Sequence, residues 1–448
     1  MAKIIILGAG LTGLSAAYHL EQNGFFDYKI YDKEDAPGGL CRSVQQDGFT
    51  FDYTGHLLHI NDPYMESFSN DNLGKKNFNT IVRRSFIQSH DTFIKYPFQI
   101  NLYGLPSKVI SECIEGFVNR PQSNKDPKSF HAWVMKHFGA GLAKHFFTPF
   151  QSKILAYDIK KITPSWTGRF VPKTSLTQMI DGALGGQKED EKVGYNSTFF
   201  YPQKGGISYI ISSLVAKIKN QIQTGFEMES IDLQNKVVTF TNGDFETYDH
   251  LINTIPLDNF LKKTVDSSAT NLNPQHKNLV CNSVFNFNLG INRADLTTKH
   301  WIYFPEGEYP FYRLGFPHNF AKSMAPAGCS SLYGECAFVG QTDTQALLAN
   351  ALDKTKKILN LNDNEIITQK IITIPRAYVL YTFWREKNLP QLLNQLEQHA
   401  IYSIGRYGGW KYSSMQESIL DGQKVAQQIL SEQQVMPSQQ FEQENLFK

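Results

Sequence analysis

Cysteine is scarce in this chain, and its spacing excludes several classes of protein. The 448 residues include five cysteines, at Cys41, Cys113, Cys281, Cys329 and Cys336. None of them forms a C-x-x-C pair, so the sequence offers neither a zinc-ligand pattern nor a dense disulfide framework. We therefore expect reduced thiols, no metal site and a cytoplasmic location.

A charge excess and long apolar runs are also lacking. Lys and Arg number 44 against 42 for Asp and Glu, which gives a formal net charge of +2. Nucleic-acid binders usually carry a strong basic excess, so we expect no nucleic-acid partner. No stretch reaches the length of a membrane span, and the first apolar run is too short for a signal peptide. The sequence leaves the oligomeric state open.

What the chain does have is a dinucleotide-binding pattern at its start. Residues 3–7 are typical of a buried parallel strand, and Gly8-Ala9-Gly10-Leu11-Thr12-Gly13 follows directly. A helical stretch, a second strand and an acid complete a β-α-β unit, in which a pyrophosphate approaches the helix N-terminus. A glycine-rich turn can be purely structural, but this order of elements favours dinucleotide binding. The expected contacts are Gly8, Gly10, Gly13 and Asp32.

A second glycine pair follows the acid, in Ala36-Pro37-Gly38-Gly39-Leu40-Cys41-Arg42. This stretch resembles the second fingerprint of FAD proteins of the amine-oxidase and UDP-galactopyranose-mutase superfamily. The resemblance implies that the loop lies along the FAD pyrophosphate, and it favours tightly bound FAD over NAD. The implied contacts are Gly38, Gly39, Leu40 and Arg42.

The alternation of segments predicts an α/β fold: a Rossmann-like FAD-binding domain with an inserted helical module and an antiparallel-sheet substrate domain. Residues 107–118 and 129–147 have helical periodicity, whereas residues 279–289 and 301–316 have strand patterns. The charged, glycine-rich loop over residues 182–195 is expected to be solvated, and a role as a flap stays open. The expected division is 1–95, 191–270 and 386–435 for the FAD-binding domain, 96–190 for the helical module, 271–385 for the substrate sheet and 436–448 for a flexible tail.

Further motifs narrow the superfamily to one family. The chain resembles UDP-galactopyranose mutase, and the eukaryotic-type enzymes more than the bacterial ones. The resemblance covers nearly the whole chain in order. It implies a redox-neutral isomerase that interconverts UDP-galactopyranose and UDP-galactofuranose, or a close nucleotide hexose, through a sugar adduct at N5 of reduced FAD. A reductant such as NAD(P)H would be a partner. The similar stretches begin with Tyr96-Pro97-Phe98-Gln99. The specific blocks are Trp301-Ile302-Tyr303-Phe304-Pro305-Glu306 with Pro310-Phe311-Tyr312-Arg313, and Gly405-Arg406-Tyr407-Gly408-Gly409-Trp410-Lys411-Tyr412.

The resemblance also implies roles for single residues. Arg313 matches the diphosphate-binding arginine, Tyr378 and Tyr412 match two phosphate-binding tyrosines, and His56 matches the histidine beside the flavin. Arg169 is expected to be the second arginine of this catalytic set, one place earlier than an ungapped match. The other matches are Tyr96, Phe98 and Gln99 for uracil, Asn196, Trp301 and Tyr303 for the sugar, and Met228, Gly405, Arg406 and Gln416 for FAD.

Two other functions stay open from the sequence. An FAD-dependent amine oxidase or desaturating oxidase needs oxidised flavin and an apolar or amine pocket, which the arginine and tyrosine set disfavours. A flavin-bound binding protein without catalysis is the residual alternative. Two departures from the family pattern leave the identity of the nucleotide base and of the sugar undetermined by the sequence. They are Thr54-Gly55-His56 in place of Gly-Gly-His, and Gln151-Ser152-Lys153-Ile154-Leu155 where Asn and Trp are usual.

Overall fold

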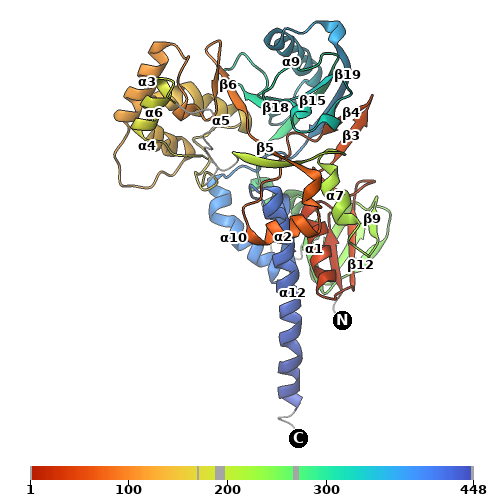
Figure 1. Ribbon diagram of the computed structural model, residues 1–448. Coiled ribbons are helices and arrows are strands. Elements are labelled where there is room, and N and C mark those ends of the chain that lie inside the picture. The colour runs from red at the N-terminus through yellow and green to blue at the C-terminus, as the bar shows by residue number, and fades with distance from the viewer. Residues whose placement is uncertain (1–2, 169–170, 187–196, 266–271, 445–448) are drawn as a thin grey trace.

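The parallel sheet that the first residues predict forms the lower body in Figure 1. The computed structural model describes residues 3–168, 171–186, 197–265 and 272–444. The strands lie in the order β20-β13-β1-β2-β9, and each pairing between them is parallel. They are β20 (Ile401–Ser403), β13 (His250–Asn253), β1 (Ile4–Leu7), β2 (Tyr28–Asp32) and β9 (Ile222–Thr224).

The turn from β1 into α1 (Leu11–Gln22) depends on its glycines. All four β1 side chains are buried, as expected of a central parallel strand. Gly8 has φ +97°, a conformation that L side chains rarely adopt. A Cβ on Gly13 would lie 1.9 Å from the Gly8 carbonyl oxygen, so helix and strand approach at a distance that only glycine allows. The predicted β-α-β unit is confirmed.

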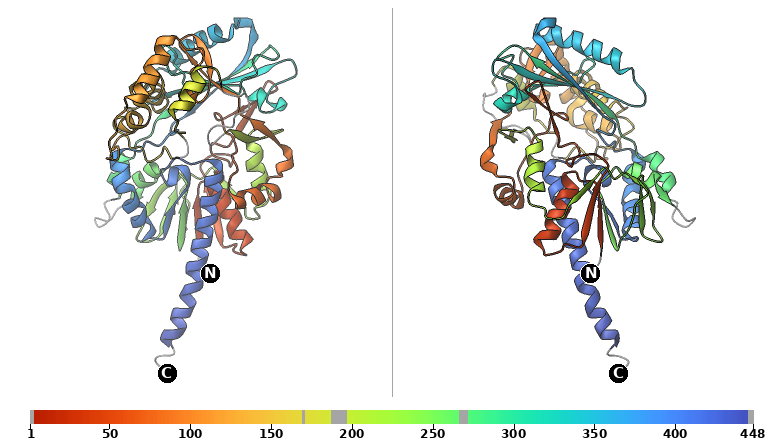
Figure 2. Two further views of the ribbon diagram at one scale, coloured as in Figure 1. Left: turned by 60° about the vertical axis from the view of Figure 1, so that its left-hand side comes forward. Right: turned by 90° about the vertical axis from the view of Figure 1, so that its right-hand side faces the viewer.

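The first part of the last helix, α12 (Met415–Glu444), packs against α1, so a C-terminal segment contacts an N-terminal one. The Ser15 hydroxyl donates to the Ile419 carbonyl at 2.6 Å, and a Cβ on Gly422 would lie 2.6 Å from the Ala16 nitrogen. The far part of α12 extends away from the body in both views of Figure 2. The flexible tail over residues 436–448 and the domain boundaries stay predictions.

A mixed sheet forms the second body, in the order β19-β15-β18-β17-β16-β6-β7. Its pairings are antiparallel except that between β16 and β6, which is parallel. Helix α9 (Thr344–Leu359) packs on one face, where its apolar side chains join those of β15 and β18 in a single core. The strands are β19 (Ile366–Ile374), β15 (Ser283–Ile291), β18 (Ser330–Phe338), β17 (Arg313–Gly315), β16 (Trp301–Tyr303), β6 (Ser85–Ser89) and β7 (Thr92–Lys95).

The helical module lies beside the mixed sheet (Figure 1). Helix α3 (Ser107–Val118) matches its predicted bounds, and α4 (Phe130–Leu142) begins where the Ser129 hydroxyl accepts from the Ala132 N–H at 3.2 Å. A π-helical turn, η3 (Ala143–Phe147), joins α4 to α5 (Thr148–Leu155), so the helical path runs past the predicted end at residue 147. Helix α6 (Leu176–Ala183) completes the module.

The stretch over residues 226–248 forms two successive hairpins rather than the one that its pattern suggests. They share β11 (Val237–Phe240), which pairs with β10 (Met228–Asp232) and with β12 (Phe245–Thr247). None of the described helices combines the length and apolar character that a bilayer crossing requires. The remaining regular elements include α2 (Pro63–Asp71), α7 (Ser208–Val215), α8 (Leu257–Lys262), α10 (Phe383–Glu397), α11 (Gly405–Gly408), β3 (Ser43–Gln46), β4 (Phe49–Asp52), β5 (Phe78–Val82), β8 (Thr198–Pro202) and β14 (Thr264–Val265).

Candidate active site

The two glycine pairs of the N-terminal region lie against each other at the start of α1. Gly10 and Gly38 form a parallel bridge, and the Gly38 N–H donates to the Ala9 carbonyl at 2.8 Å. A Cβ built on Gly10 would meet only the Gly39 Cα, at 3.8 Å, so the backbone borders open space there. The Asp32 carboxylate accepts from the Ala9 N–H at 2.7 Å at the end of β2. This is a cradle that a pyrophosphate fits and a side chain would fill.

Two later segments close this cradle. Gly405, at the start of α11, has φ +78°, and a Cβ there would lie 2.6 Å from the Thr12 hydroxyl oxygen of α1. The start of β10 lies beside β2, because the Phe226 N–H donates to the Asp32 carbonyl at 2.9 Å, and Met228 follows, buried. The structure therefore brings the FAD contacts predicted from separate parts of the sequence to one edge of the parallel sheet, and this arrangement fits FAD.

The remaining predicted FAD side chains are held by the protein itself. Arg42 donates from Nε to the Gly39 carbonyl at 3.0 Å, and Leu40 is partly buried in the same loop. Arg406 donates to the Ala377 and Ser413 carbonyls at 3.0 and 2.9 Å. The Gln416 amide pairs with Asn61, which it contacts both as donor and as acceptor. Each of these residues braces a segment near the cradle.

A cavity of about 200 Å³ lies between the helical module, the mixed sheet and the C-terminal segment. Its lining combines a polar group of side chains, here called the polar end, with an apolar group, so a bound molecule with one charged part and one flat, apolar part would suit it. The polar end consists of Tyr96, Tyr303, Arg313, Tyr378, Tyr381 and Tyr412; the apolar group consists of Phe146, Phe147, Phe150, Ile154, Leu155, Ile162, Trp166, Val171, Pro172, Val379 and Leu380, and the amides of Gln99 and Gln151 also line the cavity.

The polar end is built on a row across three strands. Arg313 of β17 lies opposite Tyr303 of β16 on one side and opposite Glu335 of β18 on the other. Residues directly opposite in antiparallel strands project from the same face, so this register puts a phenol, a guanidinium and a carboxylate side by side. Arg313 donates from Nε and Nη2 to the two Glu335 oxygens, each at 2.7 Å.

Charge and burial set the protonation states at this end. The Glu335 side chain is fully buried. Burial by itself lowers the pKa of the Arg313 guanidinium, but Glu335, with the phenols of Tyr333 and Tyr378, raises it above its ordinary value. Burial raises the pKa of Tyr378 and of Tyr412, so both phenols remain protonated and act as hydrogen-bond donors at neutral pH. A permanent cation beside neutral phenols is an environment for an anionic ligand.

His56 lies near this polar end, within reach of the charges of Arg406, Glu335 and Arg313. Burial, followed by the nearby charge of Arg406, lowers its pKa to about 4, so the imidazole is neutral at pH 7. Its Nδ1 is buried and has no hydrogen-bond partner among the described residues. Thr54, two residues earlier, has φ +73°, which is a strained conformation for a β-branched residue. The position therefore suits the glycine that the related family has there.

Several predicted residues do not line the cavity. Phe98 is fully buried and stacks on Phe146, with ring centroids 5.0 Å apart. Trp301 is 1% exposed and packs against Phe199. Arg169 and Asn196 lie outside the described residues, so their expected contacts stay predictions.

The sequence analysis did not single out Glu335, Tyr381 or the aromatic pair of the π-helical turn, Phe146 and Phe147. Glu335 and Tyr381 belong to no recognised motif. A π-helical turn leaves no periodic signal in so short a stretch. Strand register alone places Glu335 beside Arg313. Contact with the segment that carries Tyr412 brings Tyr381 to the cavity.

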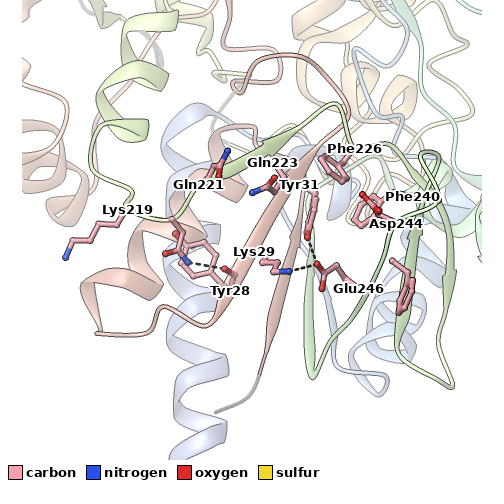
Figure 3. Close-up of a pocket in the computed structure, with 13 residues that line it drawn as sticks. Tyr28, Lys29, Tyr31, Lys219, Gln221, Gln223, Phe226, Phe240, Asp244 and Glu246 are labelled. Carbon is pink, nitrogen blue, oxygen red and sulfur yellow. Dashed lines mark hydrogen bonds and ion pairs between the residues drawn. The ribbon is translucent and has the colours of Figure 1, made fainter.

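A larger hollow, of about 730 Å³, lies at the far edge of the parallel sheet (Figure 3). It is not the candidate site, because its buried-side carboxylate, Glu246, is already fully paired. Glu246 accepts from Lys3, from Lys29 and from the Tyr31 hydroxyl, the last two shown in Figure 3. The smaller cavity instead leaves part of a guanidinium and several phenols facing its interior.

Comparisons with known proteins agree with this geometry. A crystal structure of reduced UDP-galactopyranose mutase is similar, with a TM-score of 0.90 and 28% identity over 96% of this chain and 94% of that one. A putative protoporphyrinogen oxidase from Exiguobacterium sp. 255-15 has the same fold, with a TM-score of 0.74 and 16% identity over 96% of this chain and 99% of that one.

Several curated relatives are named as carotenoid desaturases or oxygenases. The 4,4'-diapolycopene oxygenase of Methylomonas sp is 22% identical over 73% of each chain. The zeta-carotene-forming phytoene desaturase of Myxococcus xanthus is 38% identical over 66 residues, which are 15% of this chain and 13% of that protein. A family model for flavin containing amine oxidoreductases matches residues 11–430. The chain therefore belongs to the flavin containing amine oxidoreductase family, whose cofactor is FAD.

Proposed function

We propose that the protein is a flavin-dependent nucleotide-sugar mutase that interconverts the pyranose and furanose forms of a UDP-hexose, with UDP-galactose as the first candidate. The observation that carries the proposal is the position of Arg313, which faces one cavity together with Tyr378 and Tyr412. The similarity to reduced UDP-galactopyranose mutase over almost the whole chain supports it.

The lining of the cavity suits both parts of a nucleoside diphosphate. Arg313 has five N–H donors and gives two to Glu335, so three remain for phosphate oxygens. The phenols of Tyr378 and Tyr412 add neutral donors to the same group. Gln99 and Gln151 line the same cavity as several aromatic rings, and amides beside rings suit a flat heterocycle with polar edges.

In this proposal the residues of the chain bind and orient, and they hold the leaving diphosphate close to the sugar. Reduced FAD supplies the nucleophile, with no net redox change over the cycle. Arg313 and the phenols stabilise the negative charge of the diphosphate. Neutral His56 cannot repel a cationic or electron-poor sugar centre. Arg169 as a second diphosphate cation and Asn196 and Tyr303 as sugar contacts complete the proposed site, whereas the buried ring of Trp301 can only support it from behind.

The test is a reaction with dithionite-reduced protein. The reduced protein is incubated with UDP-galactose and with a panel of other nucleotide hexoses, and pyranose and furanose forms are separated. We expect conversion only when the flavin is reduced, without consumption of reductant in proportion to product. Absence of conversion for every nucleotide sugar in the panel would contradict the proposal.

A second candidate is an FAD-dependent oxidoreductase of the amine-oxidase type. The observation in its favour is the apolar group of the cavity lining, whose phenylalanines and aliphatic side chains would cover a hydrocarbon or amine substrate. The names of the carotenoid relatives point the same way. This candidate predicts sustained oxygen consumption or acceptor reduction with an apolar substrate, and none with a nucleotide sugar.

A further inference from the structure

Tyr381 lines the same cavity as Tyr378 and Tyr412, and it contacts the Tyr412 backbone. It lies just before α10, three residues after Tyr378, and the family resemblance assigns it no role. We infer that Tyr381 is a third phenol that binds the diphosphate, and that Arg385 positions both Tyr381 and the loop that carries Tyr412. This inference rests on the function proposed above and adds a binding residue and a positioning residue to it.

The first observation is the hydrogen bond that Tyr381 already makes. Its phenol oxygen accepts from the backbone N–H of Tyr412 at 2.9 Å. A phenol that accepts through its oxygen still has its own O–H to donate. No acceptor for that O–H lies within the described part of the chain, and the side chain borders the cavity. A bound ligand is therefore the group that would accept from it.

The second observation is the guanidinium on the Tyr381 ring. The Arg385 Cζ lies 3.7 Å from the ring centroid, and the Arg385 residue is 9% exposed. A planar guanidinium stacked at this distance fixes the ring and, as a cation, strengthens the phenol as a donor. The bond that the oxygen accepts polarises the O–H in the same sense. Tyr381 is thus a preorganised donor.

The third observation is the strained loop that Arg385 holds. Trp410 is fully buried and has φ +44°, a conformation that costs free energy in a bulky residue. Arg385 donates from Nε to the Trp410 carbonyl at 2.9 Å, while Tyr381 accepts from the N–H of Tyr412. The pair therefore holds the peptide groups on both sides of Lys411, directly after the strained residue, and the position of the Tyr412 ring depends on it.

The ligand class follows from the donors that converge. Three phenols and part of a guanidinium offer donors and, apart from the phenol oxygens, no acceptors. A diphosphate presents only acceptors and a negative charge, so it satisfies this end completely. A hydrocarbon or an amine would leave the Tyr381 O–H and the remaining donors of Arg313 unsatisfied.

The test compares Tyr381→Phe with wild type in the FAD-loaded full chain, by calorimetric titration with UDP and with uridine. The variant loses the O–H donor and releases the Tyr412 N–H, so we expect the Kd for UDP to rise about tenfold. The Kd for uridine, which has no diphosphate, should stay the same, as should the FAD content. Tyr103→Phe, at a residue that is 68% exposed, serves as the matched control and should change neither Kd.

Arg385 is tested through the same pair of ligands. Arg385→Lys keeps the charge but loses the planar stack, so we expect an intermediate rise in the Kd for UDP alone. In the double variant Tyr381→Phe, Arg385→Lys, the two effects should combine to less than their product, because both act through one ring.

The outcomes separate this inference from the proposed function. A Tyr381→Phe variant that binds UDP as tightly as wild type would overturn the inference and leave the mutase proposal standing. Equal losses for UDP and uridine would also overturn it, since they indicate a general disturbance of the cavity. If the wild-type protein binds no UDP at all, both the inference about Tyr381 and the mutase proposal are contradicted.

Discussion

Arg313 and Glu335 lie 22 residues apart in the chain and form a two-point ion pair, with both N–O distances at 2.7 Å. The carboxylate is fully buried and the guanidinium side chain is 15% exposed. The exposed part of the arginine faces the cavity. One member of the pair therefore fixes the direction in which the other presents its remaining donors.

Glu335→Gln should destabilise the protein, because it leaves a largely buried guanidinium without its counter-charge. We expect the free energy of unfolding to fall by about 3 kcal/mol in chemical denaturation, the scale on which broken buried pairs act. Asp353→Asn breaks the exposed pair with Lys357 and is the matched control, with an expected change below about 1 kcal/mol. Equal effects of the two substitutions would contradict the structural role of Glu335.

Arg313→Ala should weaken the binding of UDP by roughly one to two orders of magnitude, because charge-assisted hydrogen bonds contribute about 1.5–3 kcal/mol each. Arg313→Lys should recover only part of this loss, because an ammonium cannot keep the planar contact with Glu335 and also reach the ligand in the same way. Titration of the FAD-loaded variants with UDP measures both. Unchanged affinity in folded, yellow Arg313→Ala protein would favour the oxidoreductase candidate.

Gly10→Val should give folded protein without FAD. The side chain would enter the open space beside Gly39, where the cofactor cradle lies, and it meets no protein atom closer than 3.8 Å at its Cβ. The visible absorbance of the purified variant, against its circular dichroism, measures the two properties separately. Gly307→Ala, where a Cβ meets nothing within 4 Å, is the control and should remain yellow. Full flavin content in Gly10→Val would place the cofactor elsewhere.

Asp52→Asn should change how stability depends on pH. Burial raises the pKa of this carboxyl to about 6, although Ser43, Tyr201 and the Ile207 N–H donate to it. The native state then keeps a proton that the unfolded state has lost, so this contribution is complete below about pH 4 and is lost as the pH rises to about 6. A difference of two pKa units corresponds to about 3 kcal/mol of free energy of unfolding. Wild type should lose this amount between about pH 4 and pH 6, and Asp52→Asn should not.

Buried histidines act in the opposite direction and remain in the variant. The folded-state pKa of His56 is lowered to about 4 and that of His300 to about 3, mainly by burial. Their native forms bind fewer protons than the unfolded chain, so their contribution rises as the pH increases toward 6.5. The difference between wild type and Asp52→Asn in denaturation at several pH values therefore isolates the carboxyl. Parallel curves would show that Asp52 titrates alike in both states.

The features that could be predicted from sequence are the local ones. The strand, glycine turn and helix at the N-terminus follow one another within a few residues, and each has its own propensity signal, so the β-α-β unit could be identified. Helix α3 was predictable for the same reason. Arg313 could be singled out because it lies within a recognisable block of neighbours.

The features that could not be predicted depend on contacts between distant residues. Glu335 gains its role only from the register of β17 against β18, which no local pattern encodes. Tyr381 reaches the cavity through its hydrogen bond to Tyr412, 31 residues away. Trp301 matches a sugar-pocket residue by family resemblance, but its ring packs against Phe199 in the core. In each case tertiary packing, rather than propensity, decides where the side chain goes.

The cross-strand row has a consequence for how this chain tolerates insertions and deletions. Side chains alternate between the two faces of β17, with Arg313 toward the cavity and Leu314 toward the core beneath α9. Loss of one residue within the strand would exchange these faces, placing a leucine before the ligand and a guanidinium among apolar side chains. The connection between β18 and α9, residues 339–343, is exposed throughout and imposes no such alternation. Length changes that preserve the enzyme should therefore accumulate in that connection and be absent from the strand itself.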